Sequence, residues 1–260
     1  MRYKKHKEAQ KILCDVIANP LKYYVVHYSC ESFYDITDGR TPRITSIALR
    51  NFDTAQTDSF SIHKVAEKKH IDLLKIDEKY DELERQMLKE YFEYIEKHGT
   101  DIFLHWNMRS MNFGFKAIEH RQEVLNGNVP YKLPDNQKID ISRLFINKYG
   151  DAYIDHPRLE NLLIKNSIEP KNFLVGADEA KAFENKEYIK LHQSTLGKVD
   201  ALSNLIDKAA HNTLKTSAKW KEIYGFSANG ILEFLRANWW GQLILFILAT
   251  VIGIIVSRLF

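Results

Sequence analysis

The sequence contains few cysteines and no strong charge imbalance. Its two cysteines, Cys14 and Cys30, give no disulfide framework and no repeated metal-binding spacing, so we expect a reducing compartment. The formal net charge is only +3, which neither demands nor excludes a nucleic acid partner. Internal repeats and low-complexity tracts are lacking, and the basic N-terminus is not followed by the apolar segment of a signal peptide. The 260 residues therefore suit one compact domain, alone or with an appendage.

Long apolar runs are also lacking, except at the C-terminus. From Trp239 to Phe260 the only charged residue is Arg258, and about 20 apolar residues suffice to span a bilayer. Trp239 and Trp240 stand where an interfacial aromatic belt would lie. Four basic residues precede this segment: Lys215, Lys219, Lys221 and Arg236. Residues 239–260 are therefore expected to be a single-pass C-terminal anchor in the lipid bilayer, with the N-terminal domain in the cytosol. The alternative is a buried C-terminal helix.

The stretch Tyr23–Glu31 is rich in β-branched and aromatic residues and leads into a turn-prone segment. This composition predicts a buried strand that ends at a loop. Because side chains alternate along a strand, His27, Ser29 and Glu31 share one face. Ligands in open α/β sheets bind at the carboxyl ends of strands, so this end of the strand is the expected site.

The hydrophobic pattern predicts a regular order of further elements. Strands are expected at 43–49, 57–63, 101–107 and 138–142, and helices at 7–18, 81–98, 113–125, 156–168 and 180–209. Three consecutive strands imply an antiparallel meander, and the later strands, separated by helices, imply parallel crossovers. The expected fold is α/β, with a mixed five-stranded sheet flanked by helices. The expected divisions are an N-terminal helix (1–21), this domain (22–209), a basic linker and juxtamembrane segment (210–238) and a transmembrane anchor (239–260).

That order of elements, with particular residues at its joints, resembles the ribonuclease H-like fold of the DEDD 3′–5′ exonucleases. The family's first motif is Asp-x-Glu on strand one, followed by a strand similar to Arg-Ile-x-x-Ile-Ala. This chain has Ser29-Cys30-Glu31 and then Arg43-Ile44-Thr45-Ser46-Ile47-Ala48. Further counterparts are His105-Trp106-Asn107, Asp140, the segment from His156 and the helix around Asp200. The resemblance covers residues 22–207.

The resemblance implies a site in which four carboxylates hold two divalent metal ions. Glu31 and Asp200 match metal ligands, Ser29 replaces the first Asp, and the second-motif Asp is missing, with Ser110 or Asn112 nearby. The general base is expected at Thr195 or Leu196, and His192 lies two turns before Asp200. The implied catalytic residues are Glu31, Asp200 and His192. These degenerate motifs leave too little oxygen charge for ordinary Mg²⁺ chemistry.

Two interpretations of the remaining polar residues stay open. In the first, His27, Glu31, His105 and Asp200 converge as metal ligands, with His192 as a further candidate. This mixed set suits Zn²⁺, Mn²⁺ or Fe²⁺ better than Mg²⁺. In the second, the histidines are ordinary buried polar groups, and the fold is an inactive nuclease retained for binding.

Candidate nucleic-acid-binding residues follow the fourth expected strand: Trp106, Asn107, Arg109 and Asn112. Arg121 and Arg143 are further candidates for phosphate contacts. Lys198 is interpreted as part of a solvated helix face.

Three functions follow, of which the third is a partner-binding subunit with no ligand site. The first is a membrane-anchored, exonuclease-like protein that binds nucleic acid or nucleotides, and cleaves them if the site is active. The second is an inactive sensor or scaffold whose output is the membrane segment, through clustering or membrane disruption. Ala249 and Gly253 form a small-residue pair that would suit a homo-oligomer. By analogy, a nuclease-like module with an anchor fits bacterial defence against phage, together with a defence-system partner.

Overall fold

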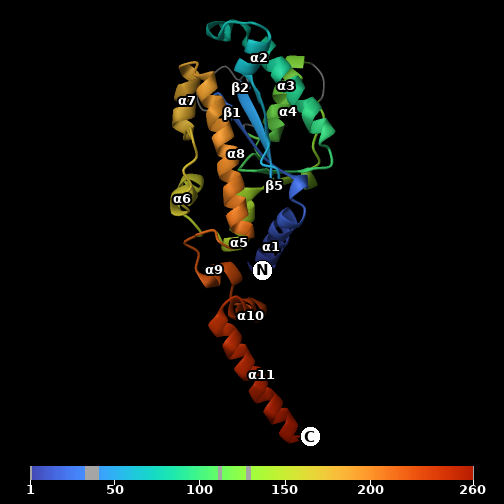
Figure 1. Ribbon diagram of the computed structural model, residues 1–260, viewed down its shortest axis with the longest axis vertical. Coiled ribbons are helices and arrows are strands. Elements are labelled where there is room, and N and C mark those ends of the chain that lie inside the picture. Colours follow the sequence, from blue (N-terminus) through green and yellow to red (C-terminus); the bar gives the residue numbers. More distant parts are fainter. Residues whose placement is uncertain (1, 33–40, 111–112, 127–129, 260) are drawn as a thin grey trace. The chain divides into compact units, whose positions relative to one another are not determined.

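The computed structural model of the chain describes residues 2–32, 41–110, 113–126 and 130–259 (Figure 1). The chain forms two compact units, which are described separately. The larger unit comprises Leu13–Arg143 and Leu163–Leu214. The smaller comprises Met1–Ile12, Leu144–Leu162 and Lys215–Phe260.

The larger unit is built on a five-stranded sheet with the strand order β3-β2-β1-β4-β5. Its strands are β1 (Tyr23–Cys30), β2 (Ile44–Asn51), β3 (Thr57–Ser61), β4 (Ile102–His105) and β5 (Lys138–Asp140). β1, β2 and β3 form an antiparallel meander, whereas β4 runs parallel to β1 and β5 runs parallel to β4. The mixed sheet expected from the sequence is therefore confirmed.

Helices pack on both faces of this sheet, as the alternation of strand side chains requires. Val26 and Tyr28 of β1 belong to a buried apolar core with residues of α3 (Tyr80–Lys97) and α4 (Phe115–Asn126). The opposite face of β1 and β2 packs against α8 (Tyr188–Ala210), which runs along these strands (Figure 1). The remaining helices of this unit are α2 (Ile62–Lys68) and α7 (Gly176–Glu184).

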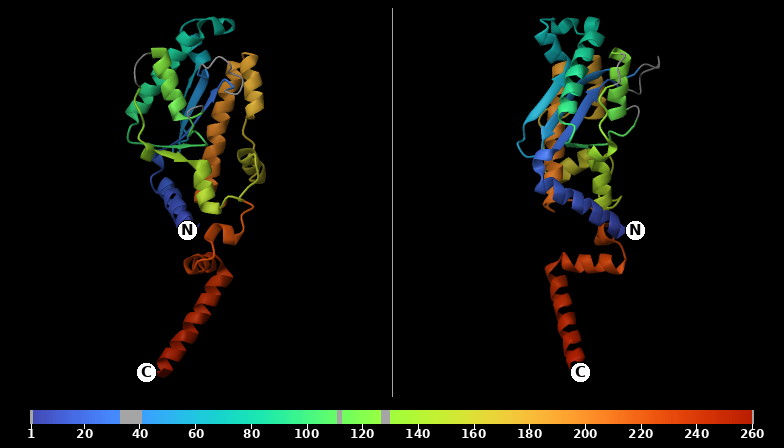
Figure 2. Two further views of the ribbon diagram at one scale, coloured as in Figure 1. Left: turned by 180° about the vertical axis from the view of Figure 1, so that it is seen from behind. Right: turned by 90° about the vertical axis from the view of Figure 1, so that its right-hand side faces the viewer.

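Three further helices begin or end across the division between the units: α1 (Arg2–Ala18), α5 (Ile141–Tyr149) and α6 (Arg158–Lys165). The smaller unit also contains α9 (Trp220–Tyr224), α10 (Ala228–Arg236) and α11 (Trp239–Leu259). Within this unit α10 packs against the start of α11, and the rings of Phe234 and Trp240 lie 5.6 Å apart (Figure 2). Among the described residues, the span Trp239–Ser257 is the one helix that is long and apolar enough to cross a membrane.

The structure corrects several expected boundaries. The helix expected over 180–209 is two helices, because the chain breaks after α7 and Lys186 adopts a positive φ of 61°. The strand expected over 138–142 ends at Asp140, whose carboxylate accepts the N–H of Ser142 at the start of α5. The expected strand 57–63 ends at Ser61, where α2 begins. The basic connection before the apolar segment contains α9 and α10.

Candidate functional site

A cavity with a volume of 870 Å³ opens at the carboxyl end of β1. We call it the cleft. Its walls come from the end of β1, the segment after β4, the start of α7 and the middle of α8. The side chains that carry chemistry there are His27, Ser29, Cys30, Glu31, Asn107, Phe113, Glu179 and Lys198.

A cluster of hydroxyl groups ties α8 to the sheet beneath the cleft. Thr195 Oγ1 of α8 lies 3.0 Å from Ser29 Oγ of β1 and 2.8 Å from Ser46 Oγ of β2. All three residues are buried, and Ser29 and Ser46 are register partners in the β1–β2 pair. The sequence places Ser29 at the first acidic position of the exonuclease motif. Thr195 is the residue of α8 that faces it, so a neutral hydroxyl pair stands at this point of the cleft.

An internal ion pair lies directly beside the hydroxyl cluster. Lys198 Nζ is 2.6 Å from Glu179 Oε2, and Glu179 Oε1 accepts hydrogen bonds from Ser29 at 2.9 Å and Ser194 at 3.2 Å. Lys198 is only 6% exposed. The interpretation of Lys198 as part of a solvated face is therefore wrong. Lys198 lies three residues after Thr195 and four before Leu202, on the apolar stripe of α8 that meets the sheet.

The sequence carries no signal for Glu179, because no motif distinguishes it from other acidic residues in helices. The burial of Lys198, in contrast, is indicated by the sequence. Lys198 lies at helical spacing in the buried stripe of Leu191, Thr195 and Leu202. A lysine at such a position must find a buried partner or lose its charge. Glu179 is that partner.

His27 faces the cleft from β1 and is buried. Its Nδ1 has no hydrogen-bond partner among the described residues. Burial, and then the nearby charge of Lys198, hold the pKa of His27 well below the ordinary value for histidine. His27 is therefore a neutral imidazole near neutral pH. Cys30 is not an activated nucleophile, because burial and the nearby carboxylates of Glu179 and Glu31 raise the pKa of its thiol to about 12.

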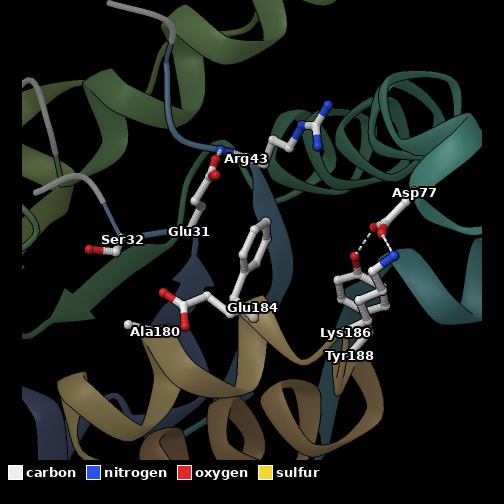
Figure 3. Close-up of a pocket in the computed structure, with 9 residues that line it drawn as sticks. Glu31, Ser32, Arg43, Asp77, Ala180, Glu184, Lys186 and Tyr188 are labelled. Atoms are coloured by element: carbon white, nitrogen blue, oxygen red, sulfur yellow. Dashed lines mark hydrogen bonds and ion pairs between the residues drawn. The ribbon is translucent and has the colours of Figure 1, made fainter. Parts of the chain in front are cut away.

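Glu31 stands at the mouth of the cleft and also lines a neighbouring cavity of 290 Å³, shown in Figure 3. Its Oε2 accepts the backbone N–H of Arg43 at 3.3 Å. Glu184 also lines this cavity. On its far side, Asp77 is bound by Lys186 and by the hydroxyl of Tyr188, as the dashed lines in Figure 3 show.

The structure does not bring Asp200 to Glu31. Asp200 Oδ1 pairs with Arg50 at 3.1 Å, and Arg50 is the register partner of Val25 near the start of β1. Glu31 follows the other end of that strand. The expected joint site of Glu31 and Asp200 is thus not formed. Asp200 lies more than one turn further along α8 than Thr195, whose hydroxyl contacts Ser29.

The two other histidines proposed from the sequence lie away from His27. His192 Nε2 is 3.0 Å from Ser59 Oγ of β3, and burial lowers its pKa to about 3, with smaller contributions from Lys64 and His63. His105 pairs in register with Val26, so its side chain lies on the opposite face of the sheet from His27. His27, Glu31, His105 and Asp200 therefore do not converge on one point.

The four residues proposed to bind nucleic acid have different surroundings. Asn107 is exposed, lines the cleft and has a positive φ of 56°. Arg109 lies outside the cleft, and Trp106 is buried at 8% exposure, so its ring is not offered to a base. Asn112 lies outside the described residues. Phe113 lines the cleft, with its ring stacked on Tyr28 at 4.6 Å.

The residues present do not fit the two divalent ions that the exonuclease resemblance implies. Among the described residues, no group of three or more His, Cys, Asp and Glu side chains could hold a metal ion. Around Ser29 the structure places hydroxyl groups and the carboxylate of Glu179, but the ammonium of Lys198 already balances the charge of that carboxylate.

The sheet order and the cleft at the end of β1 define an exonuclease-like domain of the ribonuclease H-like fold. Residues 11–157 match the family model described as DNA polymerase family B, exonuclease domain, and the chain belongs to this family. This match confirms the DEDD exonuclease resemblance found in the sequence. No curated protein matches the chain. The matched region ends before α7 and α8, which supply Glu179 and Lys198 to the cleft.

Proposed function

We propose that this chain is a membrane-attached exonuclease-fold protein that holds a nucleotide or the end of a nucleic acid strand without metal-dependent cleavage. The observation that carries this proposal is the ion pair of Lys198 and Glu179, at 2.6 Å, beside Ser29. The ammonium of Lys198 supplies a single, fixed positive charge within the cleft. A divalent cation brought close to it would be repelled, and Glu179 is already neutralised by Lys198.

The cleft nevertheless retains groups that suit a nucleoside. Phe113 stands at its wall, and base stacking on an aromatic ring is tolerant of sequence. Asn107 and Glu31 supply an amide and a carboxylate, which bind the hydroxyl groups of a sugar. The volume of 870 Å³ accommodates a ligand of nucleotide size.

The direct test uses the full chain in lipid nanodiscs, with fluorescently labelled single-stranded DNA and RNA of 12 nucleotides. Binding is followed by fluorescence anisotropy in EDTA, and cleavage is followed on gels in Mg²⁺, Mn²⁺ or Zn²⁺. We expect binding that EDTA does not abolish, and strands that stay intact in every metal. The variant Phe113→Leu should bind roughly tenfold more weakly, because one stacked base is lost.

Phe52→Leu is the matched control, because Phe52 follows β2 and lines no part of the cleft. Its affinity should equal that of the unchanged chain. Metal-dependent shortening of the strands that disappears in Glu31→Gln would overturn the proposal in favour of an active exonuclease. Absence of saturable binding to both strands and to free nucleotides would overturn it in favour of a protein whose output is the membrane segment. The role in defence against phage stays a prediction by analogy.

A further inference from the structure

A second cavity, of 430 Å³, opens at the carboxyl ends of the parallel strands β4 and β5. We call it the basic pocket. The ionisable side chains that line it are His105, Arg109, Lys116, Asp135, Lys138, Asp140 and Arg143. They come from β4, from the segment that follows it, from α4, from the turn before β5, and from β5 with the first turn of α5.

The basic pocket is separate from the cleft. No described residue lines both cavities. His105 shares the sheet face of Val26, which belongs to the core with α3 and α4, whereas His27 and Ser29 face α8. Lys116 and Arg143 line the basic pocket alone, and Phe113 lines the cleft alone, so substitutions at these residues test the two cavities separately.

The basic pocket carries more positive than negative charge. Of its cations, Arg109 is paired with Asp140 at 2.5 Å and also donates to Asn107 Oδ1 at 2.9 Å. Within the described part of the chain, the ion-pair contacts of Lys138 are longer, at 3.4 Å to the fully exposed Asp135 and at 4.0 Å to Glu119. Solvent screens the pair with Asp135 strongly.

Two cations of the basic pocket have no ion-pair partner among the residues that the structure describes. These are Lys116 and Arg143, and both are exposed. The carboxylate of Asp140 is engaged elsewhere, since its Oδ1 accepts backbone N–H groups at the start of α5, from Ser142 at 2.9 Å and Arg143 at 3.4 Å. The pocket thus holds a surplus of positive charge in a concave site, which favours an anion.

His105 adds a neutral donor to the wall of this pocket. Its Nδ1 accepts the backbone N–H of Met108 at 3.2 Å, so the ring proton of the neutral form is on Nε2. Burial lowers the pKa of His105 to about 4, with opposing effects of Asp140 and Arg109, and the ring is therefore uncharged near neutral pH. An N–H donor beside cations is the usual combination at phosphate sites.

We propose that the basic pocket binds the phosphate group of a nucleotide-sized ligand, independently of the cleft. Arg143 and Lys116 provide the unpaired charges, Lys138 and Arg109 flank them, and the volume of 430 Å³ admits a di- or triphosphate with part of a nucleoside. The phosphate comes either from a free nucleotide or from the 5′ end of a strand. The shared chemistry is a phosphate that carries two or more negative charges.

The test uses the full chain in nanodiscs, in EDTA, with isothermal titration calorimetry. The probes are pyrophosphate, adenosine triphosphate, and one oligonucleotide prepared with a 5′-phosphate and with a 5′-hydroxyl. We expect saturable binding of pyrophosphate or the nucleotide, weakened at least roughly tenfold in Lys116→Gln/Arg143→Gln, because each lost cation removes a charged hydrogen bond. Both positions are exposed, so the double variant keeps the fold, and circular dichroism checks this.

Two controls separate this proposal from the preceding one. Lys165→Gln removes an exposed charge of α6 outside both cavities and should leave phosphate binding unchanged. Phe113→Leu should weaken strand binding in the cleft without affecting pyrophosphate. Preference for the 5′-phosphorylated strand over its 5′-hydroxyl form, lost in the double variant, would identify the strand end as the source. The proposal is overturned if no probe binds saturably, or if the double variant binds every probe as well as the unchanged chain does.

Discussion

Lys198 is the residue whose surroundings bear most directly on what the cleft can hold. Its ammonium lies against Glu179 in a place that solvent scarcely reaches, with the two side chains 8% and 15% exposed. Burial makes a lone charge costly, so each partner depends on the other. The hydroxyl groups of Ser29 and Ser194 satisfy one carboxylate oxygen of Glu179, which fixes its orientation toward Lys198.

Replacement of Lys198 by methionine should destabilise the protein by about 3 kcal/mol, because it leaves the buried carboxylate of Glu179 without its cation. Chemical denaturation of the full chain in detergent micelles, followed by circular dichroism, measures the free energy of unfolding. The double variant Lys198→Met/Glu179→Gln should recover most of this loss, since the remaining amide carries no charge.

The matched control is Lys190→Met on the same helix. Lys190 pairs with Glu187 at 2.9 Å, but the two side chains are 53% and 39% exposed, so the loss should stay below about 1 kcal/mol. Equal losses for Lys198→Met and Lys190→Met would show that the buried pair contributes nothing special to this fold.

The residues of the site were only partly predictable from the sequence. Alternation along Tyr23–Glu31 correctly placed His27 and Ser29 on one face of β1, because the period of a strand is fixed by its backbone. The residue of α8 that contacts Ser29 could not be predicted, because only packing decides which turn of a helix faces a given strand residue. The carboxylate of Asp200 made it the expected neighbour of this site, whereas the structure places Thr195 against Ser29.

At the scale of elements, buried polar contacts connect α3 and α4 to β2 and contribute to the stability of the larger unit. Glu84 of α3 is fully buried, and its Oε1 accepts the backbone N–H of Ile44 at 2.7 Å. Arg121 of α4 approaches Glu84 Oε2 to 2.6 Å and also reaches Asp81 at 2.9 Å. Arg121 is thus committed to the core and is unavailable for the phosphate contact considered from the sequence.

Arg121→Met should destabilise the protein by about 3 to 5 kcal/mol, because Glu84 would stay buried without its cation. Burial already raises the pKa of its carboxyl, so Glu84 would then be forced to take up a proton. Thermal or chemical unfolding in micelles measures this loss. Arg85→Met serves as the control on the adjacent position of α3, where the guanidinium reaches only the carbonyl of Leu125 in an exposed contact. The free energy of unfolding of the control should fall by less than about 1 kcal/mol. A small loss in both variants would contradict the interpretation that the pair of Glu84 and Arg121 stabilises the core.

Helices and strands with one clear hydrophobic period were predictable from the sequence. Where a single capping group decides whether the chain forms a strand or a helix, the type of element was not predictable. The meander β1–β2–β3 and the helix α3 follow from alternation and from the apolar stripe of Leu83, Met87 and Tyr91. The helix α5 was missed because Lys138-Ile139-Asp140-Ile141-Ser142 alternates like a strand, whereas the Asp140 carboxylate turns the chain into a helix after three residues.

At the scale of the whole molecule, an exonuclease-like domain and a possible membrane-spanning helix occur in one chain. The divisions at 22–209, 210–238 and 239–260 stay predictions. In chain order, α9 and α10 lie between α8, the last helix of the larger unit, and α11. The sequence could predict α11 because an apolar helix of this length needs no tertiary partner to be recognised.

The final prediction concerns α11 as a membrane span. Only 6% of its apolar window is buried within the protein, so its side chains need an apolar environment from elsewhere. The full chain, translated in the presence of membranes, should stay with them after carbonate extraction. Ile247→Arg/Val251→Arg should release most of it, because each charge near the centre of a bilayer costs about 2.5–3.5 kcal/mol. Ser257→Arg, near the end of the helix, should stay bound, since a terminal arginine reaches the interface.

An N-terminal tag that is digested by added protease would place the exonuclease-like domain on the cytosolic side, as the basic residues before α11 predict. Complete extraction of the unchanged chain would contradict the membrane span.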